Sequence, residues 1–383
     1  MNFNILDNLT SLGSGVLGYL LPFLFVLTIV VFFHELGHFL VARWVGIRVL
    51  VFSIGFGPEL LGFNDRHGTR WKIAAIPLGG YVKFFGDENA ASVPDQAAVV
   101  TMSEAERQQS FFYKPVSRRA AVVAAGPIAN FILAIVFFAA IFMIYGQQTT
   151  SARVDTVQPD SAAAAAGIKP GDLVLSINGG AIKTFADMQR IISASAGRTV
   201  EIAVDRGGEP VTLKAIPELK EIKDSLGNTH RVGVLGISRA MASDDLRMDP
   251  VSPTQAIILG FQETWFVVDR TLSYLGAVVI GQEAADQLGG PIRIAQVSGQ
   301  VASVGMAALI HLTAVLSVSI GLLNLFPIPL LDGGHLLFYA IEAARGRPLS
   351  ERAQEFGFRI GLAIVGMLMI FATFNDIKHL WMS

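Results

Sequence analysis

The chain contains no cysteine among its 383 residues. This absence excludes disulfide frameworks, thiolate zinc sites, iron–sulfur clusters and cysteine nucleophiles together. Any metal must therefore be bound by histidine, aspartate or glutamate side chains.

Charged residues are also scarce. They make up 16% of the chain against 52% hydrophobic residues, and the mean hydropathy is +0.52. This leaves too little polar surface to cover a soluble protein of this length, which predicts an integral membrane protein. The formal net charge of −2 gives no basic field of the kind that attracts nucleic acid, so we expect no nucleic-acid partner.

Long uncharged runs predict four membrane spans. Residues 8–33 carry no charge, and 16–33 are mostly Leu, Val, Phe and Ile, enough for a helix across a hydrocarbon core of about 30 Å. A cleaved signal peptide is the alternative, but a basic n-region and a small-residue cleavage site are missing. The other runs are 120–152 with its centre at 128–145, 294–331 with its densest part at 307–326, and 360–375, extended by Phe356 and Phe358.

The basic residues beside these runs predict the orientation. The segment between the first two spans is flanked by Arg43, Arg48, Arg118 and Arg119, and the loop before the last span carries Arg345, Arg347, Arg352 and Arg359. The positive-inside rule places both of these segments in the cytoplasm and both termini outside. The segment 147–293 is long enough to be translocated regardless of its charge, so we expect it in the periplasm.

This outer segment reads as a small soluble domain. Residues 151–217 alternate short strand-like runs at 153–157, 173–177, 200–204 and 211–215 with one helical stretch at 185–194, which predicts an α+β domain. The apolar run 253–283 is interrupted by Glu263, Asp269 and Arg270. It therefore predicts an amphipathic helix on the membrane surface rather than a fifth span.

The strongest chemical signal is the sequence His-Glu-Leu-Gly-His at 34–38. Positions i and i+4 share a face of a helix, so His34 and His38 can bind one cation, while Glu35 can reach a water on that cation. Such a motif supplies two nitrogen ligands and a general base for peptide hydrolysis. The alternative is a polar cluster where the helix leaves the membrane.

A catalytic zinc needs a third protein ligand, and the candidate is Asp332. It lies in the stretch 324–334, where Pro327 and Pro329 interrupt the third apolar run. The first and third spans run in the same direction, so this end of the third span should lie at the depth of the histidines. The alternatives are a Pro–Gly turn with Asp332 facing water, and His335 as a weaker rival ligand.

The motifs at 34–38 and 324–334 resemble the site-2 protease family of intramembrane zinc metalloproteases, and they are closest to its bacterial regulator of sigma-E protease branch. The similarity also covers 52–58, 76–83, 125–130, 289–291 and 324–375. The resemblance implies one zinc ion per chain at His34, His38 and Asp332, with Glu35 as base and Asn324 contacting the substrate helix. It also implies a single-span, anti-sigma-factor-like membrane substrate, cut after an upstream site-1 protease has acted.

Residues 48–85 read as β-hairpins with glycine turns, including Gly57. A membrane helix satisfies its own amides, so a protease must unwind it, and a hairpin edge could pair with the unwound segment. An ordinary cytoplasmic hairpin is the alternative. The expected substrate contacts are Asn324, Pro327, Pro329, Gly55, Gly79, Gly80 and Tyr81.

The sequence 161–179 resembles a bacterial PDZ domain, with Gly167, Ile168 and Gly171 in the expected peptide or gate region. Such domains bind extended C-terminal peptides by strand addition, yet a steric gate that keeps intact substrates out needs no peptide. We favour the gate slightly. The best-known members of the branch carry two such domains, whereas this sequence shows one.

The predicted fold is an α-helical polytopic membrane protein with four transmembrane helices, a cytoplasmic-side membrane-associated β-hairpin region and one periplasmic α+β PDZ domain. The expected parts are 1–46, 47–117 (hairpin region), 118–146, 147–218 (PDZ), 219–300 (linker with amphipathic helices), 301–341, 342–355 (cytoplasmic loop) and 356–383. The predicted function is zinc-dependent intramembrane endoproteolysis in the bacterial inner membrane, in contact with lipid. A non-catalytic PDZ-bearing scaffold and a metal transporter are the rivals, and both leave Glu35 without a task.

Overall fold

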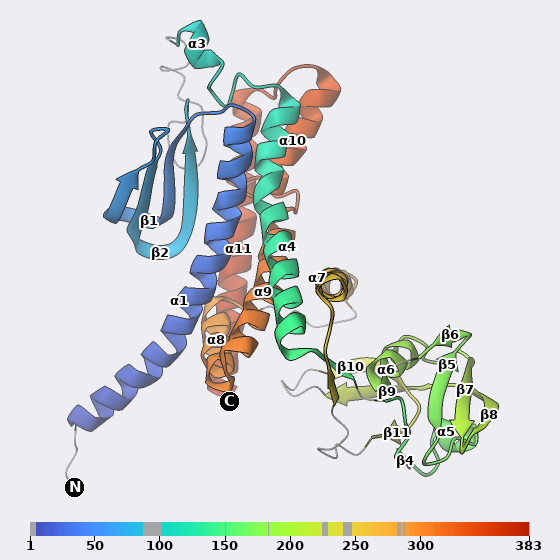
Figure 1. Ribbon diagram of the computed structural model, residues 1–383. Helices are drawn as coiled ribbons and strands as arrows, with labels where there is room; N and C mark the ends of the chain where they lie inside the picture. Colours follow the sequence, from blue (N-terminus) through green and yellow to red (C-terminus); the bar gives the residue numbers. More distant parts are fainter. Residues whose placement is uncertain are drawn as a thin grey trace. The chain divides into compact units, whose positions relative to one another are not determined.

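The computed structural model describes residues 5–86, 102–149, 151–182, 184–223, 229–239, 247–281, 285 and 289–382. The chain divides into two compact units. Unit 1 comprises Met1–Ile141 and Pro253–Ser383, and unit 2 comprises Phe142–Ser252. Figure 1 shows the elements of both, coloured along the sequence.

Four long apolar helices dominate unit 1, and they confirm the predicted number of spans within the described residues. They are α1 (Ile5–Trp44), α4 (Val116–Tyr145), α9 (Met306–Asn324) and α11 (Glu351–Met382). Their stretches suited to crossing a membrane are Val16–Trp44, Val116–Tyr145, Met306–Asn324 and Arg352–Lys378. Each is long enough for a hydrocarbon core of about 30 Å.

The four helices alternate in direction, so α1 and α9 run one way and α4 and α11 the other (Figure 1). Small residues let them approach closely, as is usual in membrane proteins. At Gly37 of α1, an added Cβ would collide with the Ala125 carbonyl of α4, and at Gly321 of α9 it would lie 3.1 Å from the Asn130 Cβ. The arrangement brings the end of α9 to the same end of the unit as the histidine motif.

A curled antiparallel hairpin, β1 (Val49–Asn64) and β2 (Arg70–Phe84), follows α1. The first part of β1 pairs with both ends of β2, since Phe52 lies opposite Trp71 and also opposite Val82. The segment 80–84 therefore forms an edge whose other side carries no strand among the described residues. Phe52 is fully buried and stacks on Trp71 at 4.2 Å, which fixes the hairpin against α1 and the start of α4.

Four further helices complete the described part of unit 1: α3 (Glu104–Arg107), α7 (Pro253–Val279), α8 (Pro291–Val304) and α10 (Asp332–Arg345). Helix α7 is not among the candidate spans. It crosses α4 rather than running alongside it (Figure 1), and a Cβ at Gly260 would lie 2.6 Å from the Ile135 carbonyl.

The apolar run 294–331 is not one helix. Gly305 has φ +138°, which separates α8 from α9, and α9 ends at Asn324 before the two prolines. Glycine alone adopts such a φ without strain, so the third span begins at Met306. The expected linker 219–300 therefore includes most of α8, which packs on α1 where Gly299 meets Tyr19.

Unit 2 contains the predicted α+β domain. Its elements are β3 (Gln147–Thr149), β4 (Thr156–Val157), α5 (Ala162–Ala165), β5 (Leu173–Ile177), β6 (Gly180–Ala181), α6 (Phe185–Ser193), β7 (Val200–Arg206), β8 (Glu209–Ala215), β9 (Glu218–Lys223), β10 (Thr229–Val234), β11 (Ile237–Ser238) and β12 (Arg247–Asp249). One sheet has the order β6-β5-β7-β8, and its core includes Val174, Ile202 and Met188.

Unit 2 extends beyond the expected domain of 147–218. Strand β11 pairs with β4, β12 pairs with β3, and β9 pairs with β10, so the segment after residue 218 belongs to this unit. The reason the sequence did not indicate this is that β11 and β12 have only two and three residues. Runs this short carry no periodic pattern, and their partners lie far away along the chain.

Candidate metal centre

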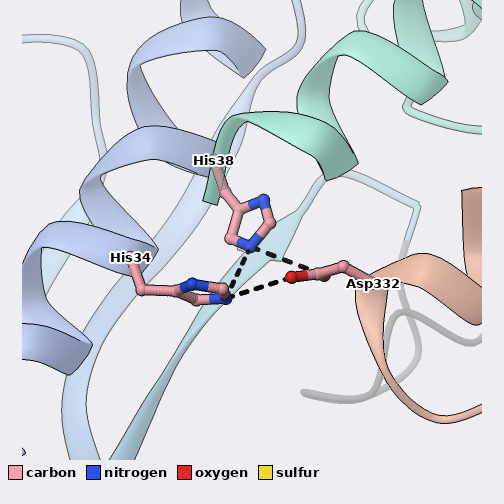
Figure 2. Close-up of side chains that lie close together, drawn as sticks. All are labelled: His34, His38 and Asp332. Carbon is pink, nitrogen blue, oxygen red and sulfur yellow. Dashed lines mark hydrogen bonds and ion pairs between the residues drawn. The ribbon is translucent and has the colours of Figure 1, made fainter. Parts of the chain in front are cut away.

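His34 and His38 lie one turn apart on the same face of α1 (Figure 2). Both rings are largely buried, with side-chain exposures of 12% and 11%. Their Nε2 atoms face each other at 3.2 Å. Two lone pairs at this distance repel each other unless a proton or a cation lies between them, so the pair is prepared to bind one or the other.

Asp332 reaches the histidines because the chain between α9 and α10 folds back tightly. The prolines at 327 and 329 cannot continue α9, and α10 begins at Asp332 itself. Gly333 and Gly334 are buried against the carbonyls of Leu325, Phe326 and Ile328, where any side chain would collide. One carboxylate oxygen lies 3.1 Å from His34 Nε2 and the other 3.6 Å from His38 Nε2.

These three side chains fit a tetrahedral zinc site. Zn–N bonds of about 2.0–2.1 Å place neighbouring ligand atoms of a tetrahedron about 3.3–3.4 Å apart. In the structure the two Nε2 atoms lie 3.2 Å apart, and the Asp332 oxygen nearest to each lies 3.1 or 3.6 Å away. One ligand atom from each of the three side chains lies within 4.8 Å of the other two. Asp332 Oδ2 is also buried, lies 3.1 Å from His34 Nε2 and accepts no hydrogen bond within the described residues, so this anionic oxygen is available to bind a cation.

Helix α4 contacts both histidine rings. The backbone carbonyl of Val122 lies 2.8 Å from His38 Nδ1, and the side-chain amide of Asn130 lies 3.3 Å from His34 Nδ1. Between them, a Cβ at Gly126 would collide with His38 Nε2 and lie 2.9 Å from His34 Cε1. Sequence reasoning assigned no role to these three residues, although an asparagine within an apolar span was an available signal.

The three candidate ligands line a cavity of about 430 Å³. The lining includes the ligands, the end of α9, the edge of β2, the first two turns of α10 and single residues elsewhere, namely Phe111, Val123 of α4 and Phe358 of α11. Glu35 is half-buried in this lining, and a Cβ at Gly80 would lie 3.0 Å from its Cγ. Among the expected substrate contacts, Asn324, Gly80 and Tyr81 line the cavity.

The other expected substrate contacts lie outside the cavity lining. Gly55 and Gly79 have φ values of +87° and +133° and shape the hairpin. A Cβ at Gly55 would lie 2.7 Å from the Ile76 carbonyl, and one at Gly79 would lie 2.5 Å from the Phe56 ring. Pro329 packs its carbonyl against Gly361 of α11, and Pro327 is exposed in the same loop.

His335, the weaker rival ligand, lines the cavity but stands apart from the ligand group. Its ring packs on Phe358 of α11 with 5.4 Å between ring centroids. The group of convergent donors among the described residues consists of His34, His38 and Asp332.

The candidate residues of unit 2 lie beside an ion pair whose carboxylate is buried. Gly167 and Gly171 have φ values of +78° and +95°, and Ile168 is 4% exposed in the core. Asp172 is buried beside them, and Arg206 donates two hydrogen bonds to its carboxylate, of 2.8 and 2.7 Å. The Arg206 guanidinium holds the pKa of Asp172 below its usual value, despite burial.

Known proteins resemble this chain along almost its whole length. The model of peptidase family M50 matches residues 22–368. Metalloprotease MmpA of Caulobacter vibrioides is 43% identical over 95% of this chain and 96% of its own, and the regulator of sigma-E protease RseP of Escherichia coli is 31% identical over 94% and 98%. Atu1380 of Agrobacterium fabrum, whose name describes it as a zinc metalloprotease, is 53% identical over 97% and 99%.

A solved structure also matches. The PDZ domain of the SdrC-like protein Lmo2051 from Listeria monocytogenes is 24% identical, covers 24% of this chain and 87% of its own, and gives a TM-score of 0.19.

Proposed function

The chain belongs to peptidase family M50, the site-2 protease family, and from that premise we propose that His34, His38 and Asp332 are the zinc ligands and Glu35 is the general base of a membrane metalloendopeptidase. The observation that carries the proposal is the convergence of three candidate ligands, whose ligand atoms lie within 4.8 Å of one another, in the wall of a cavity that Glu35 also lines.

Each side chain has a task in peptide hydrolysis. The neutral imidazoles would bind the metal through Nε2, and the Asp332 carboxylate would neutralise part of its charge. When bound, zinc supplies Lewis-acid activation of water and of the scissile carbonyl. The Glu35 carboxylate accepts the proton of the attacking water and later delivers it to the departing amide nitrogen.

The substrate is a membrane protein, and we infer that it presents an unwound segment to the edge of β2. A helix in lipid satisfies its own backbone, so its peptide bonds are accessible only after unwinding. Residues Gly80 and Tyr81 line the cavity from the free edge of the hairpin, where an extended peptide could add as a further strand. Asn324, at the end of α9, faces the same cavity and is suited to bind a peptide backbone.

The protein is a multi-pass protein of the inner membrane, and we propose the finer arrangement from the basic flanks. Both termini and residues 142–252 would lie in the periplasm, while the hairpin and the loop 342–355 would lie at the cytoplasmic side. The substrate class would be a single-span, anti-sigma-factor-like protein that a site-1 protease has already shortened on its outer side. Unit 2 would act as a PDZ-type gate that excludes intact substrates.

The test is cleavage of a tagged single-span reporter that is truncated on its outer side. Wild type should cleave it, and Glu35→Gln should bind zinc equally well but lose about 10²–10⁴-fold in rate. Glu355→Gln on the exposed side of α11 is the matched control and should cleave at the wild-type rate, because it removes only a solvent-exposed pair with Arg359. Full cleavage by Glu35→Gln would refute the base assignment, and loss of zinc from that variant would reassign Glu35 to metal binding.

A further inference from the structure

Three residues of α4 lie against the two histidines of α1, in the order expected of two antiparallel helices. Val122, Gly126 and Asn130 are four residues apart, so they share one face of α4. Val122 contacts His38, Gly126 faces both rings, and Asn130 contacts His34. Val122 and Asn130 are fully buried. Val122 and Asn130 therefore contact the Nδ1 atoms of the two rings, while the Nε2 atoms lie near Asp332.

The contact to His38 selects a single tautomer. A backbone carbonyl can only accept a hydrogen bond, so the 2.8 Å contact with the Val122 oxygen requires a proton on His38 Nδ1. A neutral His38 then carries its lone pair on Nε2, which is the atom that faces His34 and Asp332. Second contacts of this kind are how metal-binding histidines are usually oriented.

The contact to His34 depends on which end of the Asn130 amide faces the ring. The amide nitrogen Nδ2 stands 3.3 Å from His34 Nδ1, and Oδ1 is buried without a hydrogen-bond partner among the described residues. If Nδ2 donates to Nδ1, a neutral His34 must carry its proton on Nε2. That nitrogen would then have no lone pair for a metal, although it lies 3.2 Å from His38 Nε2 and 3.1 Å from Asp332.

Reversal of the amide removes this conflict. The oxygen and nitrogen ends have nearly the same size, so the exchange requires no repacking. Oδ1 then accepts the proton of His34 Nδ1, and the lone pair of Nε2 is free. In either orientation of the amide, the end that faces away from His34 has no hydrogen-bond partner among the described residues. Hydrogen bonding around Asn130 therefore favours neither orientation, whereas metal binding by His34 Nε2 requires the reversed one.

We propose that Asn130 is a positioning residue that holds His34 in its metal-binding tautomer, with Asn130 Oδ1 accepting a hydrogen bond from His34 Nδ1. The residue is fixed for this task from a third helix. Ser317 of α9 donates a 2.8 Å hydrogen bond to the Asn130 backbone carbonyl, and Gly321 packs against the Asn130 Cβ. The inference rests on the metal site of the proposed function but is independent of its substrate.

The test measures zinc affinity of the full-length protein in detergent, by competition with a chelator. Asn130→Leu has nearly the same size and no acceptor, and we expect it to bind zinc about 10–100-fold more weakly. Asn130→Asp keeps an acceptor oxygen and should bind within about threefold of wild type or more tightly. Ser319→Ala is the matched control, since it removes a hydroxyl of α9 that hydrogen-bonds the Val315 carbonyl of the same helix, and it should remain within about threefold.

Three outcomes would overturn the proposal. Asn130→Leu could bind zinc as tightly as wild type, Asn130→Asp could be weakened as much as Asn130→Leu, or Ser319→Ala could lose the same affinity through packing alone. If Asn130→Leu does not fold, Asn130→Ala, which only shortens the side chain, takes its place with the same outcomes. Because no substrate enters this measurement, a failure of the proposed substrate class would leave it unaffected.

Discussion

Gly126 offers the sharpest test of how the site is built, because it is the point where α4 approaches both imidazole rings. Replacement by alanine would place a methyl group in contact with His38 Nε2, 2.5 Å from His38 Cε1 and 2.9 Å from His34 Cε1. An ordinary contact between such atoms is about 3.5 Å. The rings or the two helices must therefore separate by roughly 1 Å at this crossing.

The expected loss falls on the metal site much more than on the fold. Overpacking costs about 1–3 kcal/mol, while alanine in a helix regains about 0.5–1 kcal/mol relative to glycine, so the net destabilisation should be at most about 2.5 kcal/mol. Metal ligands tolerate displacements of about 0.2 Å, and a misplacement of about 1 Å can cost about 10² in rate. We expect Gly126→Ala to fold, to bind zinc weakly and to cleave at least about 100-fold more slowly.

The assay combines reporter cleavage, bound zinc and thermal unfolding of the same preparations. Gly366→Ala in α11 is the matched control, since a Cβ at that position has no atom within 4 Å. It should keep wild-type zinc content and cleavage, with equal or slightly higher stability. Wild-type zinc binding and cleavage by Gly126→Ala would refute the account of α4 as a close-fitting support of the ligands.

Three further predictions concern other parts of the chain. Gly361→Ala should push α11 away from the Pro329 carbonyl and disturb the loop that positions Asp332, which should lower the cleavage rate about 10–100-fold. Gly366→Ala in the same helix should remain active, and equal cleavage rates for both variants would argue against this role of the loop. Asp172→Asn should weaken unit 2 by about 1.5–3 kcal/mol, because it removes the charge that Arg206 binds, and this would be measured as faster hydrogen exchange of β5 and β7 in the full-length protein. Because the folded-state pKa of Asp172 is lower than its usual value of 3.8, the wild-type contribution is complete above about pH 4 and is lost as the pH falls below it; exchange in wild type that does not accelerate at low pH, relative to the variant, would contradict this.

Much of the candidate site could be predicted because its chemistry is local in the sequence. His34, Glu35 and His38 lie within one turn and a half of a helix, so their spacing alone places two ligands on one face. Asp332 follows two prolines that must interrupt a helix, which predicts a polar side chain at a break inside the membrane protein. The number of spans was equally accessible, because the requirement to bury apolar side chains in lipid leaves long uncharged runs.

Other features required contacts between distant segments. Gly55, Gly79, Gly80 and Tyr81 were all expected to contact the substrate; of these four, Gly80 and Tyr81 line the cavity, and Gly55 and Gly79 have positive φ values in the curl of the hairpin. The sequence cannot separate these roles, because it gives the same residue for a glycine that a positive φ requires and for a glycine that leaves room for a substrate. Similarly, the extent of unit 2 depends on strands of two or three residues, whose pairing is decided by their partners and not by their own composition.

By itself, the sequence determined the kind of protein and the chemistry. The absence of cysteine limited the ligands, the apolar runs required a membrane, and the helical spacing of two histidines with a glutamate indicated metal-dependent hydrolysis. Only the tertiary structure decided that α4 supports the two rings, through Val122 and Asn130 on either side of Gly126. The reason is that hydrogen bonds and close approaches between antiparallel helices depend on their relative rotation and depth, which no local pattern of residues specifies.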